Sequence, residues 1–338
     1  MSNRQITIAI DAMGGEDSPI KNLRGSEIFS QKYPEVNLKI FGIKKTIIDL
    51  IRIEKININN YELIDCADNV SDNDNPNKIL RSRKDSSIFK GLKYVSQNTD
   101  SGFVSAGNTA ALMILSRLIL GMMDGVDRPA ICSKIPNLKS YSLMMDLGAN
   151  VYVNANHLLQ FALMGNTYFS IIDPKRKPKI GLINIGTENN KGLEFLQEAH
   201  DLISNSTLKE NFIGFIEPNN ITKGNCDIIL SDGYTGNIIL KTAEGLSGFI
   251  TSNLRNVFTK SIKNKLAYKF LEKDLINFKN HIDPDEYNGA TLLGINGISV
   301  KSHGSANAYA FSCAINNCYE FIKNNLNKKI INNFISAN

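Results

Sequence analysis

The feature that most constrains this chain is a junction that recurs along it, in which a short apolar run is followed by Gly, Ser, Asn or Asp residues and then by a helical pattern. Such apolar runs are typical of buried strands in a parallel sheet, and their alternation with helices predicts an α/β fold. The turns after parallel strands meet at one edge of a sheet, so we expect these junctions to gather there. They occupy residues 11–15, 105–109, 146–150, 186–192, 231–237 and 301–307.

The junction at 231–237 reads SDGYTGN and follows the apolar run 228–230. Gly233 and Gly236 allow a tight turn and a close approach to the backbone. A helix is predicted from Asn237, and the free N–H groups at its start favour an anion, to which Lys241 adds a full charge. The alternative is a strand-to-helix turn that binds no ligand, because glycine turns are common in α/β folds.

Other segments are assigned by the same patterns. Pro19 is expected to start a helix, and a polar loop and then a basic helix are predicted at 71–77 and 78–93, with the basic residues on a solvated face. His157, alone on a helix, is interpreted as structural. Strands are predicted at 6–10, 38–42, 61–64, 102–105, 142–145, 179–185, 228–230 and 297–300, and further helices at 110–120 and up to 323.

Cationic side chains accompany the junctions, namely Lys191, Lys241, Lys301 and His303, and they predict a site for a phosphate-bearing ligand. The sequence contains no GxGxxG, GxxxxGK[ST] or GxSxG motif, which argues against nicotinamide, NTPase and hydrolase sites. No His, Cys and carboxylate cluster has metal-ligand spacing.

Composition sets the broad class. The chain has 338 residues, of which 42% are apolar and 21% charged, with a net charge of +5 that is too small to indicate nucleic-acid binding. Its five cysteines show no CxxC spacing, and no signal peptide is visible, so a cytoplasmic protein with reduced thiols is expected. The longest apolar run, 110–121, is interrupted by Arg117 and is too short to cross a bilayer.

A series of segments carries a family resemblance. They are IAIDAMGGEDSP from Ile8, SAGNTAALM from Ser105, GVDRPA from Gly125, DLGANV from Asp146, HLLQFALMG from His157, GLINIGTENNKG from Gly181, DIILSDGYTGNIILKTAEG from Asp227 and YNGATLLGINGISVKSHGSAN from Tyr287. In this order they resemble the fatty acyl–acyl carrier protein:phosphate acyltransferase family of bacterial phospholipid synthesis, and they cover nearly the whole chain.

The resemblance implies a Rossmann-like α/β/α three-layer sandwich, related to phosphotransacylases and isocitrate dehydrogenases, in a single catalytic domain over residues 1–338. It implies transfer of a long-chain acyl group from acyl carrier protein to inorganic phosphate, with no cofactor and no metal. A membrane glycerol-3-phosphate acyltransferase then uses the acyl phosphate. The family also implies a homodimer that associates peripherally with the inner face of the cell membrane.

The matching segments give the expected site. Catalytic groups are expected at Lys191, Lys241, His303 and Asn307. Substrate-binding groups are expected at Asp11, Gly14, Gly15, Ser105, Asn108, Thr109, Arg128, Asp146, Asn150, Asn184, Glu188, Asp232, Gly233, Gly236, Asn237 and Lys301. The chain departs from the family pattern at Tyr152, where Asp is usual, and at Asn189, where a second Glu is usual, and these departures affect two polar contacts.

Two alternatives remain open at this point. A short-chain phosphotransacylase would use coenzyme A as the acyl carrier, and an assay with both thioester donors separates it from the carrier-protein enzyme. A non-catalytic scaffold on the membrane surface would bind acyl carrier protein and release no thiol in response to phosphate. The dense polar turns argue against the scaffold, which has no need of them.

Residues 254–275 carry an apolar helical stripe among basic side chains. The stripe consists of Leu254, Val257, Phe258, Ile262, Leu266, Phe270 and Leu271. The basic residues are Arg255, Lys260, Lys263, Lys265, Lys269 and Lys273, against Glu272 and Asp274. A basic amphipathic helix of this kind suits an anionic lipid interface or a dimer core. We expect a helical protrusion at 246–282 that forms dimer contacts and presents a tip near 266–271 to the membrane.

Overall fold

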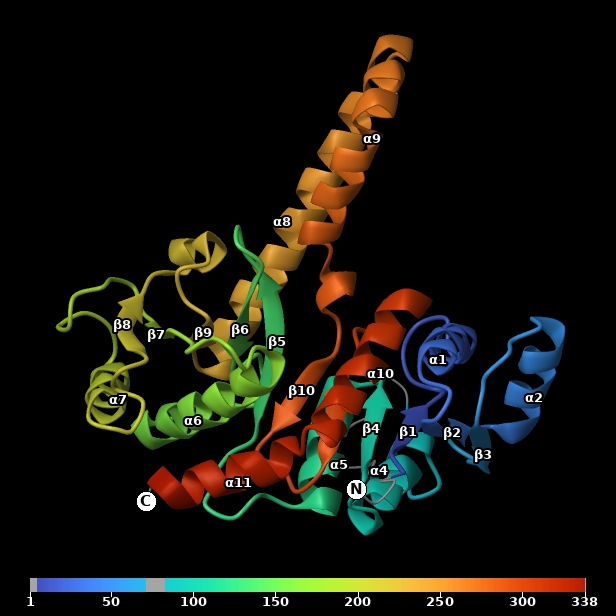
Figure 1. Ribbon diagram of the computed structural model, residues 1–338, viewed down its shortest axis with the longest axis horizontal. Coiled ribbons are helices and arrows are strands. Elements are labelled where there is room, and N and C mark those ends of the chain that lie inside the picture. Colours follow the sequence, from blue (N-terminus) through green and yellow to red (C-terminus); the bar gives the residue numbers. More distant parts are fainter. Residues whose placement is uncertain (1–4, 71–82, 338) are drawn as a thin grey trace.

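The computed structural model describes residues 5–70 and 83–337, which are organised around one eleven-stranded sheet (Figure 1). The strand order is β3-β2-β1-β4-β11-β10-β5-β6-β9-β7-β8. The strands are β1 (Thr7–Asp11), β2 (Asn37–Gly42), β3 (Tyr61–Asp65), β4 (Ser101–Ser105), β5 (Ala130–Pro136), β6 (Tyr141–Met145), β7 (Ile180–Ile183), β8 (Phe212–Ile216), β9 (Ile228–Leu230), β10 (Ala290–Leu293) and β11 (Ile298–Lys301). Every strand predicted from the sequence is present, and β5, β8 and β10 are additional.

Helices cover both faces of this sheet. They are α1 (Ile20–Lys32), α2 (Lys44–Ile53), α4 (Ser87–Gln97), α5 (Thr109–Leu120), α6 (Ala155–Ile172), α7 (Glu194–Ser204), α8 (Gly233–Thr259), α9 (Ile262–Ile282), α10 (Ala308–Lys323) and α11 (Leu326–Ala337), with 3-10 turns η1 (Pro218–Lys223) and η2 (Pro284–Tyr287). Successive strand residues face opposite sides, so Ile8 and Ile10 of β1 enter one core and Ala9 the other. The first core packs against α1, α2, α6, α7, α10 and α11, and the second against α4, α5 and the first part of α8. The predicted α/β/α three-layer fold is confirmed.

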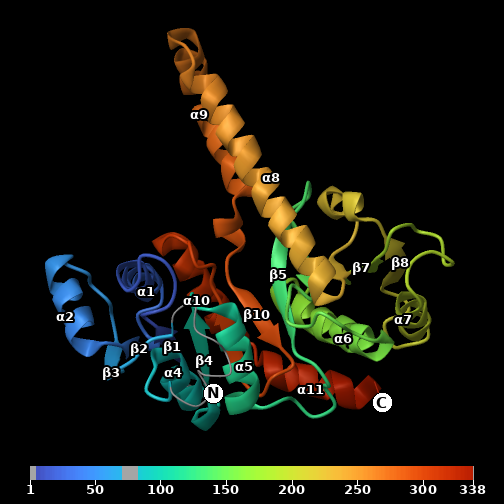
Figure 2. The ribbon, with the colours of Figure 1, turned by 180° about the vertical axis from the view of Figure 1, so that it is seen from behind.

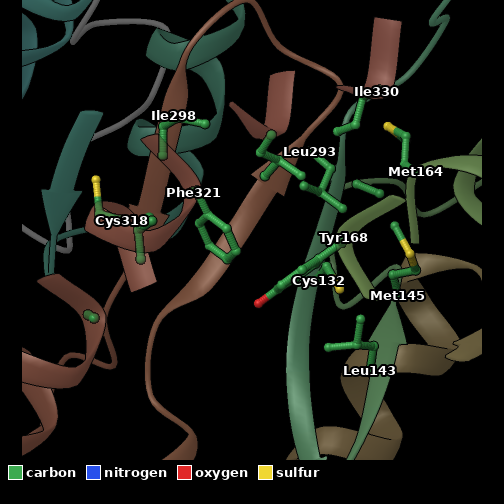
Figure 3. Packing of buried hydrophobic residues seen from close by; sticks show 14 of the residues in the cluster. Cys132, Leu143, Met145, Met164, Tyr168, Leu293, Ile298, Cys318, Phe321 and Ile330 are labelled. Carbon is green, nitrogen blue, oxygen red and sulfur yellow. The ribbon is translucent and has the colours of Figure 1, made fainter. Parts of the chain in front are cut away.

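The core under α6, α10 and α11 is densely filled and continuous across the middle of the sheet (Figure 3). Tyr168 of α6 and Phe321 of α10 meet edge to face, with ring centroids 4.8 Å apart. Leu293 of β10 and Cys132 of β5 lie in the same cluster. Packing of this kind ties the helices of the two ends of the sheet to its central strands.

The two ends of the sheet run in opposite directions. β1, β4 and β11 are parallel to one another, and β6, β9 and β7 are parallel to one another. Between these sets, β10 is antiparallel to both β11 and β5, and β5 is antiparallel to β6. The expectation that all the junctions share one edge is therefore wrong, because the β5–β6 hairpin reverses the second set.

One predicted helix is shorter than expected. The helix begins at Ser87 and is capped by the Ser86 side chain, whereas residues 83–86 form a turn in which the guanidinium of Arg83 pairs with Asp68 at 2.6 Å. The predicted loop at 71–77 and the first part of the predicted helix, 78–82, lie outside the described residues.

A pair of antiparallel helices, α8 and α9, extends away from the body (Figures 1 and 2). The chain turns at Lys260 and Ser261, and the Ser261 side chain accepts a hydrogen bond from the Asn264 N–H at 3.2 Å, which caps α9. The apolar stripe at 254–275 is therefore split between two helices. The tip lies next to Ile262, and not at 266–271 as expected.

The first turn of α8 packs closely against the loop after β6. A Cβ on Gly236 would lie 1.9 Å from the carbonyl oxygen of Asp146, and a Cβ on Gly233 would lie 2.6 Å from that of Asn150. Gly233 and Gly236 thus belong to the helix and not to a turn before it, and their missing side chains make room for protein backbone.

We expect Gly236→Ala to destabilise the fold, because neither the helix nor the β6–α6 loop has space for a methyl group. Overpacking at such a site lowers the free energy of unfolding by roughly 3 kcal/mol. Urea unfolding measures this change. Asn237→Ala, at the exposed neighbouring position, is the matched control and should shift the midpoint little; an equally stable Gly236→Ala protein would contradict the packing account.

Candidate active site

The end of β1, the end of β4 and the start of α4 are joined around the carboxylate of Asp11. Asp11 is buried at the end of β1, where Ser87 Oγ donates to Oδ1 at 2.6 Å and Ser105 Oγ donates to Oδ2 at 2.7 Å. Burial raises the pKa of Asp11, and the hydrogen bonds from Ser105, Ser87 and the Met13 N–H oppose that rise. Asp11 therefore fixes the geometry of this edge from beneath its surface.

Close backbone packing continues from Asp11 to the turn after β11. A Cβ on Gly14 would lie 2.5 Å from the Gly107 nitrogen, and Gly15 has a positive φ of 88°. The carbonyl oxygen of Gly304 accepts hydrogen bonds from the Glu16 N–H at 2.9 Å and from the ammonium group of Lys21. Because Gly14 and Gly15 have no side chains, they allow the turns after β1, β4 and β11 to pack this closely.

His303 lies at the surface of the β11–α10 turn. The Ser305 N–H donates to its Nδ1 at 3.4 Å, and Ser305 Oγ lies 2.9 Å from the same nitrogen. The bond from the Ser305 N–H favours the neutral tautomer that carries its proton on Nε2. Partial removal of water lowers the pKa of His303, Glu244 and Asp285 raise it, and Lys241 and Lys301 lower it. The net effect favours a neutral imidazole at neutral pH, with an N–H donor at Nε2.

Helix α8 brings charged side chains from the other half of the sheet to His303. Lys241 and Glu244 form an ion pair at 2.7 Å, and both act on the pKa of His303. An α-helix rises 1.5 Å per residue, so Lys241 stands about 12 Å along the axis from Gly233. This junction of α8 with the β11–α10 turn is the candidate active site.

Two further candidates of this edge have structural partners. Asn307 caps α10 by accepting from the Ala310 N–H at 2.9 Å, and its amide donates to Asp285 at 2.7 Å. His303 does not cap this helix, because Asn307 is the cap. The ammonium group of Lys301 donates to the backbone carbonyls of Ala106 and Ser302 and holds the turn after β4 against the turn after β11.

The turns after β6 and β9 form a second group at the opposite edge. Asp146 is fully buried, and its carboxylate accepts from the Ile131 N–H at 3.0 Å and the Asn150 N–H at 2.7 Å. Burial raises the pKa of Asp146 against these hydrogen bonds. The Asn150 amide also donates to the carbonyl of Pro129 at 2.6 Å, which ties the loop to the start of β5.

The start of α8 is already capped by protein groups. Asp232 accepts from the Thr235 N–H at 2.8 Å, and the Gly233 N–H donates to the carbonyl of Asn150 at 2.8 Å. The Gly236 N–H donates to the carbonyl of Asp232 at 2.9 Å. In the structure, the glycines of this turn pack against protein backbone and these N–H groups are bonded to protein oxygens. Phosphate binding at this turn stays a prediction.

The loop after β7 places Lys191 at the same second edge. Lys191 pairs with Glu188 at 2.8 Å, and both side chains are about half exposed. Asn184 is buried, and its amide donates to the carbonyl of Lys191 at 2.9 Å, so it shapes the loop. Because Leu182 of β7 lies opposite Leu230 of β9, this loop lies beside the start of α8, and Lys191 and Lys241 belong to different edges.

The remaining candidates occupy helix starts and loops. Asn108 caps α5 by accepting from the Ala111 N–H at 2.9 Å, and Thr109 is exposed beside it. Arg128 is exposed in the loop before β5, and Asn237 is exposed on α8 beside Gly148. Asn108 and Thr109 belong to the edge that carries His303, whereas Asn237 belongs to the second.

Sequence reasoning missed several residues of the junction. Lys21, Ser87, Glu244 and Asp285 each contact or act on a residue of the predicted site. Glu244 was detectable from the i, i+3 spacing with Lys241 on one helix face. Ser87 and Lys21 belong to helices distant in sequence, so no local pattern points to them.

Across residues 5–70 and 83–337, no group of three or more His, Cys, Asp or Glu residues has a metal-binding arrangement.

Comparisons with known proteins connect this geometry to a family. The model of the family described as "Fatty acid synthesis protein" matches residues 6–329. The chain is 36% identical over 330 residues to a phosphate acyltransferase of Rhodospirillum rubrum, covering 98% of this chain and 94% of the relative. It is 38% identical over 326 residues to that of Paraburkholderia xenovorans, covering 96% and 88%.

The fold also resembles that of a solved enzyme. A phosphotransacetylase from Streptococcus pyogenes superposes with a TM-score of 0.66, at 15% identity and with 95% of each chain covered. The family match spans almost the whole chain, and the segments that carry it include the β1, β4 and β11 turns and the start of α8 described above. The chain belongs to the fatty acid synthesis protein family, together with the phosphate acyltransferases.

Proposed function

We propose that the chain is a phosphate acyltransferase, which moves a fatty acyl group onto inorganic phosphate and supplies acyl phosphate for lipid synthesis. The family membership and the names of the two relatives support the acyl transfer to phosphate. The observation that carries the location of the site is that Lys241 and Glu244, an ion pair on α8, both act through their charges on the pKa of His303. A cation and a neutral hydrogen-bond donor meet there in reach of solvent, and both suit a phosphate and a thioester.

The proposed reaction needs positioning more than a strong base. A phosphate oxygen attacks the thioester carbonyl carbon, the tetrahedral intermediate carries an oxyanion, and the C–S bond breaks to give acyl phosphate and a thiolate that takes up a proton. Phosphate is anionic at neutral pH and is itself the nucleophile, so relief of charge repulsion and alignment are the main tasks. Lys241 neutralises the phosphate, and His303 Nε2–H donates to the carbonyl oxygen as it becomes an oxyanion.

We further propose that the acyl donor is acyl carrier protein, as the sequence resemblance implies, and that a membrane glycerol-3-phosphate acyltransferase consumes the product. Thiol release from long-chain acyl carrier protein and from acyl coenzyme A, each with and without phosphate, tests this. A preference for the coenzyme A donor would identify a phosphotransacylase. Thiol release that does not depend on phosphate would contradict the proposed function.

The membrane and dimer contacts are proposed for the α8–α9 pair. Ile262, Leu266 and Phe270 of α9 are 80%, 56% and 89% exposed. Lys263, Lys265, Lys269 and Lys273 surround them, a pattern that suits anionic lipid. Within the described ranges, 5–70 and 83–337, no helix combines the length and apolarity needed to span a bilayer. We propose a cytoplasmic homodimer that binds the inner face of the membrane peripherally through these exposed residues of α9.

The first prediction from this function concerns phosphate. Lys241→Ala should raise the phosphate concentration needed for half-maximal thiol release by about tenfold or more, since it removes the cation beside His303. Lys191→Ala tests the second edge of the sheet. A comparable increase in the phosphate concentration for half-maximal thiol release in this variant would place phosphate at the loop after β7. Wild-type phosphate kinetics in both variants would contradict both locations. Urea midpoints check that both proteins remain folded.

The second prediction concerns His303. His303→Ala should lower kcat about 10²–10³-fold, the cost of removing one oxyanion donor, with little change in stability. The wild-type rate should fall as pH decreases through the lowered pKa of His303, because a proton on Nδ1 displaces the hydrogen bond from the Ser305 N–H that orients the ring. Glu244 raises that pKa, so Glu244→Gln should move the fall to still lower pH. A profile that does not respond to Glu244→Gln would contradict this role.

The third prediction concerns the membrane. Leu266→Glu together with Phe270→Glu should abolish salt-sensitive binding to anionic vesicles and leave the solution mass unchanged. Asn277→Glu with Asn280→Glu introduces the same charge at exposed positions nearer the base of α9 and serves as the control. Sedimentation with vesicles, beside a mass measurement in solution, decides the question. Equal loss in the control would mean that charge alone matters, and a change in mass would show that the stripe holds a dimer together.

A further inference from the structure

A group of exposed cationic side chains lies where β6, β7 and β9 begin. They come from the β5–β6 hairpin, from the loop between α6 and β7, and from the end of η1. We call them the basic surface, which consists of Lys139, Lys175, Arg176, Lys177, Lys179 and Lys223. Such a concentration of one sign of charge creates a positive potential that attracts an acidic partner.

Hydrogen bonds hold the segments of the basic surface together. Arg176 donates to Asp173 at 2.6 Å and to Asp227 at 3.1 Å, which joins the loop before β7 to the start of β9. The Leu138 N–H donates to the carbonyl of Thr222 at 2.8 Å, which joins the hairpin to η1. Arg176 is neutralised by its two carboxylates. No ion pair joins the five lysines to an acidic residue in the part of the chain that the structure describes.

A polar pocket of about 280 Å³ opens within the basic surface. It is lined by the hairpin, by Asp173 and Arg176 and by Gly224 and Asp227. Beside it, Leu138 at the end of the hairpin is 82% exposed. A recess and an exposed aliphatic side chain among charged groups give this surface the shape and the chemistry of a site that binds a folded partner.

The basic surface lies at the same edge of the sheet as His303. Because β6, β7 and β9 run opposite to β1, β4 and β11, the starts of the former lie at the edge where the latter end. In the strand order, β9 is four strands from β11, which is about 19 Å at the spacing of neighbouring strands. A small folded domain is roughly 30 Å across, so one that is seated on the basic surface extends to His303.

Contacts between the hairpin and η2 connect the basic surface to the active site. The ring centroids of Tyr141, in the hairpin, and Tyr287, in η2, are 6.5 Å apart. Asp285 of the same turn accepts a hydrogen bond from the Asn307 amide at 2.7 Å, and its charge acts on His303. Both figures show β5 beside the base of the α8–α9 pair (Figures 1 and 2). The basic surface is therefore continuous with the site.

We propose that the basic surface docks an acidic face of the acyl carrier protein, and that docking there delivers the thioester to the edge that carries His303. The inference rests on the proposed function, because it takes the carrier protein to be the acyl donor. Charge complementarity between the two proteins would speed their encounter and fix their relative orientation. The surface acts on the donor alone and has no part in binding inorganic phosphate.

A protein fits the basic surface better than a lipid bilayer does. Leu138 is a single exposed apolar side chain, whereas binding in a lipid interface relies on an apolar stripe like that of α9. From Ile262 to its base at Ile282, α9 is about 30 Å long. A bilayer that meets the far end of α9 therefore stands away from the basic surface, and a small domain has room between them.

The test compares two donors that carry the same acyl chain. One is the acyl carrier protein, and the other is acyl-pantetheine, an uncharged thioester without the protein. Lys175→Glu with Lys177→Glu reverses two exposed charges of the basic surface. Lys328→Glu with Lys329→Glu makes the same charge change at exposed positions of α11, across the body from the hairpin, and is the matched control (Figure 1). Urea midpoints check that both variants remain folded.

We expect the basic-surface variant to lose about tenfold or more in kcat/KM with the carrier protein at low salt, since steering by charge contributes on this scale. Its kcat at saturating carrier protein, its phosphate requirement and its turnover of acyl-pantetheine should match the wild type. Added salt should lower kcat/KM with the carrier protein more steeply in the wild type than in the variant. The control variant should behave as the wild type.

Several results would overturn the proposal. Wild-type kinetics of the basic-surface variant with the carrier protein would refute docking at this surface. An equal loss with acyl-pantetheine would show that the lysines act on the active site itself, and an equal loss in the control would show that only net charge matters. Loss of binding to anionic vesicles with unchanged carrier kinetics would assign the surface to lipid.

The docking surface and the proposed function can fail separately. Calorimetry measures binding of the carrier protein without turnover, and the basic-surface variant should bind it more weakly than the control does. Thiol release that is independent of phosphate, together with this weaker binding, would refute the proposed function and leave the docking surface standing. Equal binding by both variants, in an enzyme whose thiol release depends on phosphate, would refute the docking surface alone.

Discussion

The contact between the first turn of α8 and the loop after β6 determines where the catalytic side chains lie. The carbonyl oxygen of Asp146 occupies the position that a Cβ on Gly236 would need, and the Gly233 N–H is bonded to Asn150. The buried Asp146 carboxylate holds that loop rigid through the Ile131 and Asn150 N–H groups. With its start anchored in this way, α8 has a fixed direction, and it carries Lys241 and Glu244 to positions from which their charges act on the pKa of His303.

The directions of the strands explain why a long helix has to connect the two edges of the sheet. Because β5 and β10 reverse the direction of the second set of strands, the turns after β6, β7 and β9 cannot share an edge with those after β1, β4 and β11. A long helix that starts at one edge and passes the central strands connects the two groups. The buried carboxylates Asp11 and Asp146 each organise one edge, whereas the groups suited to chemistry, Lys241 and His303, are exposed where α8 meets the other edge.

Local elements of this fold could be predicted from the sequence, because apolar runs and turn residues act over short distances. The strand at 228–230 and the helix after Pro19 follow directly from such patterns. The reversal at the β5–β6 hairpin could not be predicted, since strand direction depends on pairing between distant segments. Gly233 and Gly236 could indicate either a ligand or a packed backbone, and the packing against Asp146 depends on a distant segment that no local pattern reveals. The bonds of Asn307 to Ala310 and Asp285 join segments that no local pattern connects, and its catalytic role stays a prediction.

The central claim is that phosphate binds beside His303, between the β11–α10 turn and α8. Titration of the His303 imidazole by NMR, with and without saturating inorganic phosphate, tests it most directly, and His303→Ala assigns the resonance among the four histidines. A phosphate anion at this position stabilises the imidazolium, so the account predicts that phosphate raises the pKa of His303 and leaves those of the other histidines unchanged. An unchanged His303 titration, in a protein whose thiol release depends on phosphate, would contradict the account.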